Sequence, residues 1–265
     1  MSAYVDVHTH LTHAAFEQDQ DLVIKRAEDS GLGAVVVNGL EPKSNREILK
    51  MRSKSPIIKA ALGIYPIDAV NDRLPSDFPL DIEAFDVEEE IRFIEEQAKS
   101  GALIGIGECG LDGHWLNDET FSRQEYVFEQ LLDIAMKYDL PAIIHTRKRE
   151  KRSMEILRHL GVRKVNFHCY GGKSKLALQA AEKEGWFFSI PANAKVNQLF
   201  TKLLRELPED QILTETDAPY LSPDRNTRNE PANVVHTVSL LAKLKNWDVA
   251  EAKLKIWNNY QQLFG

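Results

Sequence analysis

The sequence predicts an α/β protein whose eight parallel strands close into a (β/α)8 barrel, the TIM barrel, with the catalytic site at the carboxyl ends of the strands. Short apolar runs alternate with longer segments of helical period, which is typical of a parallel sheet. Eight such repeats in 265 residues favour a closed barrel over an open doubly wound sheet. No glycine-rich phosphate loop of the dinucleotide type follows any of the runs, which counts further against the open sheet.

The predicted elements alternate along the whole chain. The apolar runs predicted to be strands span residues 3–8, 33–38, 56–64, 102–108, 140–145, 164–168, 186–190 and 211–217. The segments of helical period span about 19–30, 43–53, 87–101, 123–138, 153–160, 175–185, 195–207, 232–245 and 249–264. Residues 65–86, after the third strand, contain several prolines, which discourage regular structure. In a barrel this loop lies on the catalytic face, where it either covers the substrate or is a passive insertion.

Composition and charge limit the class of protein. Residues 1–265 contain no linker-like segment or internal repeat, so we expect a single domain. A net charge of −7 argues against a surface coated for non-specific nucleic-acid binding, although a local basic groove remains possible. The two cysteines, Cys109 and Cys169, fit a reducing compartment. Neither a membrane span nor a secretory signal is recognisable, so we expect a cytoplasmic protein, and its oligomeric state is left open.

Six side chains that can bind a metal ion stand at the ends of predicted strands. They are His8 and His10 on the first strand, Glu108 on the fourth, His145 on the fifth, His168 on the sixth and Asp217 on the eighth. Side chains alternate between the two faces of a strand, so His8 and His10 point the same way. Because the carboxyl ends of barrel strands meet at one face, all six side chains can converge although they are far apart in sequence.

Four imidazoles and two carboxylates exceed the needs of one tetrahedral ion, which favours two divalent ions that share a carboxylate. We expect Glu108 to bridge them, with His8, His10 and Asp217 on one ion and His145 and His168 on the other. Two ions ~3.5–4 Å apart can hold a hydroxide and lower the pKa of that water towards ~7. The predicted chemistry is therefore hydrolysis.

Two carboxylates near the end of the eighth strand have further predicted roles. Asp217 can also accept the proton of the nucleophilic water, and we count it with Glu108 as catalytic. Glu215 lies two residues earlier on the same face, so it should lie deeper and accept a hydrogen bond from a metal-binding imidazole.

The same motifs resemble those of a known family. The His-x-His pair, "GECGLD", "AIIHTR", "NFHCYGG", "TETDAPYL", "RNEPANV" and "NNYQQLFG" are similar, in that order, to motifs of the TatD-type metal-dependent deoxyribonucleases of the amidohydrolase superfamily. The likeness covers nearly the whole chain. It implies a (β/α)8 barrel with a divalent-metal site that hydrolyses DNA, often from the 3′ end. Carried over by motif, the metal ligands fall on His8, His10, Glu108, His145, His168 and Asp217.

Two departures from the family pattern concern the substrate. The family commonly has a histidine that contacts phosphate before the proline that follows the third strand, whereas "LGIYP" places Tyr65 there. After the fifth strand, "HTRKREKR" replaces the usual aspartate with basic residues, and Arg147 next to His145 can neutralise a phosphate. Arg228, after the eighth strand, can reach a phosphate or form a structural ion pair. Aromatic rings at Tyr65, Trp115 and Tyr220 are candidates to stack on an unpaired base.

The leading hypothesis is a phosphodiesterase that hydrolyses DNA with two divalent ions, and the resemblance implies that it acts as an exonuclease. Histidine-rich ligation suits zinc or manganese, and the resemblance admits magnesium. One alternative keeps the site but hydrolyses a small ester, amide or lactone. Another is a metal-binding barrel without catalytic activity.

Overall fold

The computed structural model describes residues 2–75, 77–116 and 118–265, and within them eight parallel strands form one sheet in the order of the sequence. The strands are β1 (Tyr4–Thr9), β2 (Leu32–Asn38), β3 (Ile58–Leu62), β4 (Gly105–Asp112), β5 (Ala142–Arg147), β6 (Val165–His168), β7 (Phe187–Ile190) and β8 (Ile212–Thr214). The predicted barrel is confirmed.

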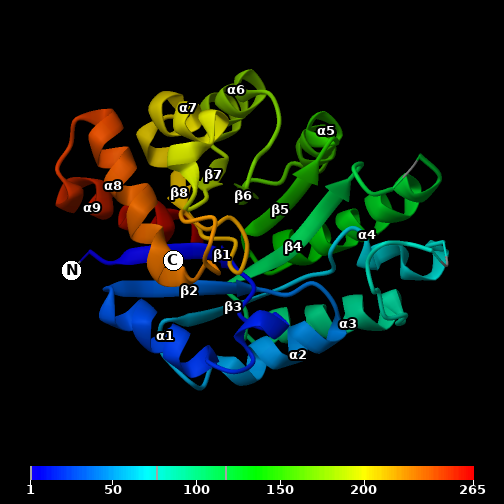
Figure 1. The fold of residues 1–265 in the computed structure, drawn as a ribbon. Coiled ribbons are helices and arrows are strands. Elements are labelled where there is room, and N and C mark those ends of the chain that lie inside the picture. The colour runs from blue at the N-terminus through cyan, green and yellow to red at the C-terminus, as the bar shows by residue number, and fades with distance from the viewer. Residues whose placement is uncertain (1, 76, 117) are drawn as a thin grey trace.

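Helices surround these strands on the outside (Figure 1). They are α1 (Gln20–Asp29), α2 (Pro42–Met51), α3 (Val87–Lys99), α4 (Asp118–Lys137), α5 (Glu150–Leu160), α6 (Ser174–Glu184), α7 (Gln198–Glu206), α8 (Val234–Lys245) and α9 (Val249–Phe264). Short 3-10 turns lie at η1 (Ala14–Phe16), η2 (Asp68–Arg73), η3 (Ala194–Val196), η4 (Glu209–Gln211) and η5 (Pro231–Asn233). None of the helices in the described part of the chain has the length and apolar character that a membrane crossing requires.

The strands are apolar on both faces because side chains fill the barrel inside and helices cover it outside. In β2, Ala34, Val35, Val36 and Val37 are all completely buried. Continuous apolar runs of this kind are typical of parallel sheets covered by helices, whereas one-sided sheets alternate apolar and polar residues. The core therefore fixes the strand ends from which the polar side chains of the site project.

The barrel closes between β1 and the segment that follows β8. The backbone N–H of Asp217 donates to the carbonyl of His8 at 2.9 Å, and the N–H of His10 donates to the carbonyl of Ala218 at 2.8 Å. Deeper in the barrel, the Thr214 hydroxyl donates to the carbonyl of Val5 at 2.8 Å. The first and last strands are thus joined by residues that also carry candidate metal ligands.

Several strand ends differ from the sequence prediction, and three of these differences bear on the site. β4 continues four residues past Glu108 because it stays paired with β5 as far as Asp112 and Arg147. β5 likewise continues two residues past His145, and β8 stops at Thr214, before Glu215 and Asp217. In addition, α4 begins at Asp118, earlier than the expected start near residue 123. His145 therefore lies within the paired part of β5, which fixes its backbone more firmly than a loop would. Glu108 lies in β4 at an irregularity of the pairing, and its N–H donates to the carbonyl of Gly39 at 3.0 Å.

Gly110 shows how closely β4 approaches β5. It has a φ of +143°, and a Cβ built there would lie 2.0 Å from the carbonyl oxygen of His145. Since that oxygen belongs to a strand backbone, it cannot move aside cheaply.

We expect Gly110→Ala to lower the free energy of unfolding by about 2 kcal/mol or more, because overpacking costs about 1–3 kcal/mol and the backbone conformation adds to it. Urea unfolding measures the effect. Gly171→Ala is the matched control, because an added Cβ there meets nothing within 4 Å. Equal stabilities of the two variants would contradict this account of the β4–β5 approach.

Candidate metal centre

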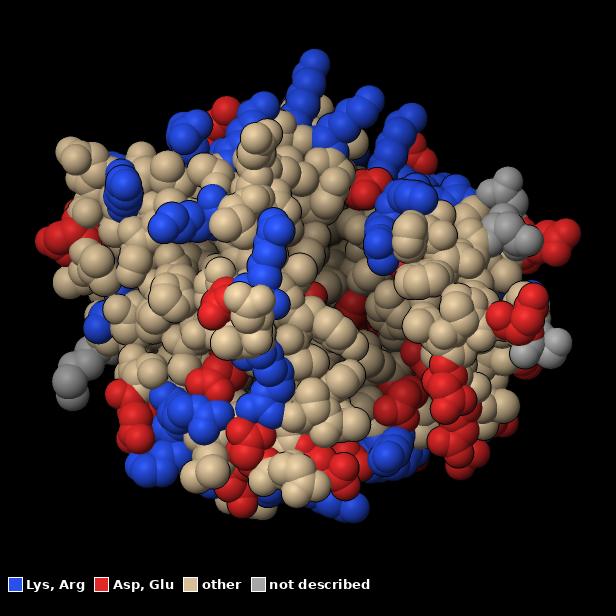
Figure 2. Space-filling model, viewed as in Figure 1, with Lys and Arg blue, Asp and Glu red and all other residues tan. Residues whose placement is uncertain are grey.

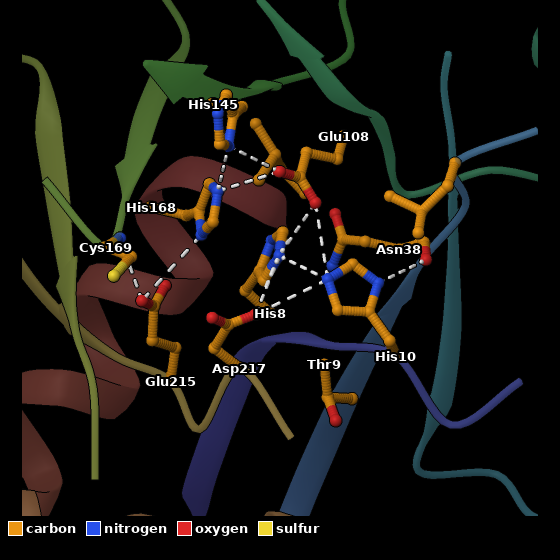
Figure 3. Close-up of polar contacts among 12 residues, drawn as sticks. His8, Thr9, His10, Asn38, Glu108, His145, His168, Cys169, Glu215 and Asp217 are labelled. Atoms are coloured by element: carbon orange, nitrogen blue, oxygen red, sulfur yellow. Dashed lines mark hydrogen bonds and ion pairs between the residues drawn. The ribbon is translucent and has the colours of Figure 1, made fainter. Parts of the chain in front are cut away.

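The structure brings the six predicted ligand side chains into one pocket (Figure 3). They come from β1 and the residue after it, from β4, β5 and β6, and from the segment after β8: His8, His10, Glu108, His145, His168 and Asp217. His8 is completely buried, and Glu108 is 2% exposed. The Asp217 side chain is the most open, at 16% exposed. Asp217 has a φ of +55°, a left-handed conformation that aspartate tolerates better than most residues.

One side of the pocket is formed by His8, His10 and Asp217. The Nε2 atoms of His8 and His10 lie 3.1 Å apart, and each is 3.3 Å from Oε2 of Glu108. Oδ1 of Asp217 lies 3.7 Å from Nε2 of His8 and 3.4 Å from Nε2 of His10. Two imidazoles and two carboxylate oxygens therefore surround one point.

The other side of the pocket uses the second oxygen of the same glutamate. Oε1 of Glu108 lies 2.8 Å from Nδ1 of His145 and 3.0 Å from Nε2 of His168, and these two nitrogens are 3.3 Å apart. Figure 3 shows the Glu108 carboxylate between the two pairs of imidazoles. Each oxygen of Glu108 thus serves a different pair.

These contacts fit a site for divalent cations. In each pair, two imidazole nitrogens face each other, and at most one of them can donate a hydrogen bond to the other. The Nδ1 atoms of His8 and His168 are buried without a hydrogen-bond partner in the described residues. Burying so many polar atoms is costly unless an ion or a proton satisfies them. Imidazole nitrogens with carboxylate oxygens are the donor set of zinc and related transition metals.

The charges of the pocket depend on one another. Burial opposes ionisation of Glu108, but the imidazoles of His168 and His8 outweigh it and hold the pKa of this carboxyl well below its usual range. Burial lowers the pKa of His8 to about 3. Burial also disfavours charge on His10 and His145, yet neighbouring carboxylates prevail: Asp217 and Glu108 raise the pKa of His10 to about 10, and Asp112 and Glu108 raise that of His145 to about 9.

Polar groups behind the pocket orient some of the imidazoles. Nδ1 of His10 lies 3.2 Å from the carbonyl oxygen of Asn38, and Nε2 of His145 lies 3.1 Å from Oδ2 of Asp112. Sequence reasoning missed Asp112, although strand alternation places it on the same face as Glu108. The predicted strand ends at Glu108, four residues before Asp112, and so places Asp112 in a loop.

Glu215, predicted to accept a hydrogen bond from a ligand imidazole, lies next to one. Its Oε1 is 4.0 Å from Nδ1 of His168, which is longer than a hydrogen bond. The carboxylate instead accepts from the backbone N–H of Cys169 at 2.8 Å and from the hydroxyl of Ser189. A role for Glu215 in orienting His168 stays a prediction.

The predicted substrate-binding residues lie around the pocket in different settings. Arg147 ends β5 with an exposed side chain that has no hydrogen bond or ion pair with any described residue. The Tyr65 ring meets the His145 ring edge to face, with centroids 4.9 Å apart. Arg228 is bound to Asp19 through two nitrogens, each 2.8 Å from a carboxylate oxygen. Arg228 therefore forms the structural ion pair that was one of its two predicted roles, and its contact with substrate phosphate stays a prediction.

The face of the molecule in Figure 2 has a hollow to the right of its centre, and Asp and Glu atoms are visible inside it. Lys and Arg side chains gather above the hollow. A negative interior attracts cations, and a positive edge attracts a polyanion.

Comparison with known proteins identifies the family. The family described as TatD related DNase matches residues 5–265. The chain belongs to this family. An uncharacterized metal-dependent hydrolase of Methanocaldococcus jannaschii is 32% identical over 263 residues, which cover 98% of this chain and 96% of the relative. The 3′-5′ ssDNA/RNA exonuclease TatD of Erwinia tasmaniensis is 28% identical and covers 98% of both chains.

Solved structures of the TatD family agree with this fold. The TatD homologue YJJV from Escherichia coli superposes with a TM-score of 0.83 at 21% identity, and the match covers 98% of this chain and 97% of the homologue. As a TatD-family member, the chain is a metal-dependent hydrolase that acts on ester bonds. The predicted family and enzyme class are confirmed.

We expect metal binding to release about two protons at pH 7.5, because ligation needs a free nitrogen on His10 and on His145, whose pKa values lie above that pH. The affinity for zinc should accordingly rise as the pH increases from about 6 to 9. Calorimetry in buffers of different ionisation enthalpy counts the protons. His145→Ala should lose about one of them, and His236→Ala, on the exposed surface of α8, should lose none. A binding enthalpy that does not depend on the buffer would contradict this prediction.

Proposed function

We propose that the chain, as a single domain over residues 1–265, is a DNA phosphodiesterase that removes nucleotides from the 3′ end with two divalent ions, zinc, manganese or magnesium. The observation that carries this proposal is the placement of the two Glu108 oxygens, each facing its own pair of imidazoles. Family membership supports DNA as the substrate, and the name of the Erwinia relative supports the direction of cleavage.

In this proposal one ion is held by His8, His10 and Asp217, the other by His145 and His168, and Glu108 bridges them. When bound, such a pair of ions lowers the pKa of a water and stabilises the attacking and leaving oxygens of an in-line displacement. His8 suits a ligand role because its low pKa leaves the imidazole neutral. Glu108 suits the bridge because it stays ionised.

Asp217 is the proposed proton acceptor. Burial raises the pKa of its carboxyl, but the hydrogen bond from His10 and the charges nearby outweigh burial and lower it below the ordinary value. The carboxylate is therefore ionised at neutral pH. It is also the more exposed of the two ligand carboxylates, which leaves it open to an attacking water.

Three side chains are proposed to hold the phosphate backbone. The guanidinium of Arg147 has no hydrogen bond or ion pair with the described residues, and it can neutralise a phosphate next to the pocket in charge-assisted hydrogen bonds. Burial raises the pKa of Tyr65 above its ordinary value, so its hydroxyl stays protonated and can donate to a phosphoryl oxygen. Arg228 would contact a more distant phosphate while Asp19 holds its other side.

Glu108→Gln tests the bridge. We expect the loss of at least one bound ion and a fall in the cleavage of linear single-stranded DNA by about 100-fold or more, since the amide cannot bridge two cations. Metal analysis and a size-resolved nuclease assay measure both. The control is Glu184→Ala, which removes a surface carboxylate paired with Arg158.

The same assay separates the alternatives. Linear DNA with a free 3′ end should be shortened, whereas circular single-stranded DNA should survive. Cleavage of the circle would overturn the exonuclease proposal. Hydrolysis of small esters, amides or lactones without DNA cleavage in magnesium, manganese or zinc would replace it with the small-substrate alternative, and no turnover at all would favour a metal-binding barrel.

Arg147→Ala should weaken DNA binding and reduce the slope of log affinity against log salt concentration by about 1, as expected for one lost phosphate contact. The measurement is fluorescence anisotropy with a labelled oligonucleotide at several salt concentrations. Arg163→Ala is the matched control, because Arg163 is also exposed but precedes β6, at the opposite end of the barrel. An equal effect of both changes would show that net charge, not the position of Arg147, attracts DNA.

A further inference from the structure

Asp112 is a completely buried carboxylate at the end of β4 that none of the proposed steps uses. Its two oxygens have different partners. Oδ2 lies 3.1 Å from Nε2 of His145. Oδ1 accepts hydrogen bonds from the backbone N–H groups of His114, at 2.7 Å, and of Trp115, at 3.1 Å.

These partners fix where the proton of His145 sits. A carboxylate that accepts from two backbone N–H groups and faces an imidazole is stabilised in its ionised form, which can only accept hydrogen bonds. Nε2 of His145 must then carry the hydrogen. In the neutral imidazole, Nδ1 is then the nitrogen without a hydrogen, and it is the atom that faces Glu108 at 2.8 Å and His168 at 3.3 Å.

The backbone of Asp112 is held as firmly as its side chain. Gln124, a completely buried residue of α4, accepts from the N–H of Asp112 at 2.8 Å and donates to its carbonyl at 3.2 Å. On the other side, the next residue, Gly113, donates to the carbonyl of Arg147 at 2.8 Å. Asp112 therefore has little freedom to follow His145 if the ring turns.

The second oxygen ties a surface loop to the same carboxylate. Residues 113–116 leave β4 on the catalytic face, and the side chain of Trp115 is 39% exposed there. The rings of His114 and Trp115 meet edge to face with centroids 5.0 Å apart. One carboxylate thus anchors an exposed aromatic loop on one side and a candidate metal ligand on the other.

We propose that Asp112 is a positioning residue that joins the loop carrying Trp115 to His145 and sets the affinity of the His145–His168 side of the centre for its ion. This inference rests on the two-ion site of the proposed function. A carboxylate behind a ligand imidazole typically contributes 10–100-fold in metal affinity, because it fixes the tautomer and raises the basicity of the ligand nitrogen.

Asp112→Asn separates the two contacts of the carboxylate, one with the loop N–H groups of His114 and Trp115 and the other with Nε2 of His145. The amide oxygen can still accept from the loop N–H groups, but the amide nitrogen cannot accept from Nε2 of His145. We expect one ion to bind as in the native protein and the other about 10–100-fold more weakly in a zinc titration against a chromophoric chelator. In the metal-free protein at a pH above the His145 pKa of about 9, where the imidazole is neutral, nitrogen NMR shifts should show a single His145 tautomer for native Asp112 and a mixture, or the other tautomer, for Asn.

Asp112→Ala removes both the contact with the loop N–H groups and the contact with His145. Hydrogen exchange at the amides of His114 and Trp115 should accelerate in the Ala variant and stay near native in the Asn variant.

On a His145→Ala background, Asp112→Asn should not weaken zinc binding further, since the two residues act as a unit. Asp86→Asn is the matched control: Asp86 also accepts from a backbone N–H, at the start of α3, and has no hydrogen bond or ion pair with an imidazole among the described residues. It should bind both ions as the native protein does.

The outcomes separate this inference from the proposed function. If the native protein binds two ions and Asp112→Asn binds both with unchanged affinity, Asp112 has no positioning role, and the two-ion function stands. If the native protein binds a single ion, the two-ion proposal fails, and the NMR and exchange results still decide whether Asp112 orients His145 and the loop. Additive effects of Asp112→Asn and His145→Ala would also overturn the inference, because they would indicate a general loss of stability.

Discussion

The backbone hydrogen bonds between β1 and the segment after β8 hold together both the barrel and the candidate metal centre. Asp217 donates to His8, and His10 donates to Ala218, so the contacts that close the sheet are made by residues whose side chains face the pocket. Asp6 reinforces this closure, because its buried carboxylate accepts from the N–H groups of His8 at 3.2 Å and Thr216 at 2.9 Å. The geometry of one side of the centre is therefore part of the geometry of the fold.

The same closure brings ionisable side chains together in the protein interior, where their burial costs free energy. Two carboxylates and four imidazoles meet in a pocket that is closed to water at His8 and Glu108. Groups of this kind are costly to bury, and a buried ion pair is weak evidence for stability. Catalytic function gives such a cluster a reason to persist, because a divalent cation satisfies the facing nitrogens and the carboxylates together. Strands with closely packed, buried side chains provide the rigidity that this cluster needs.

Much of this arrangement can be predicted from the sequence, because apolar runs mark the strands and alternation marks the faces. Alternation alone predicts that His8 and His10, two residues apart, point to the same side of the strand. The extension of β4 to Asp112 could not be predicted in this way, because Gly110 and Leu111 continue the strand through pairing with β5 rather than through an apolar pattern of their own. Tertiary contacts also decide the partner of Arg228, since Asp19 lies 209 positions away in the chain. No local pattern contains that information.

The central claim is that Glu108 lies between two cations, each held by its own pair of imidazoles. Anomalous diffraction from crystals grown with manganese or zinc tests it directly. The account predicts two anomalous peaks, one against His8, His10 and Asp217 and the other against His145 and His168, with the Glu108 carboxylate between them. A pocket without peaks, or peaks bound by other residues, would contradict it.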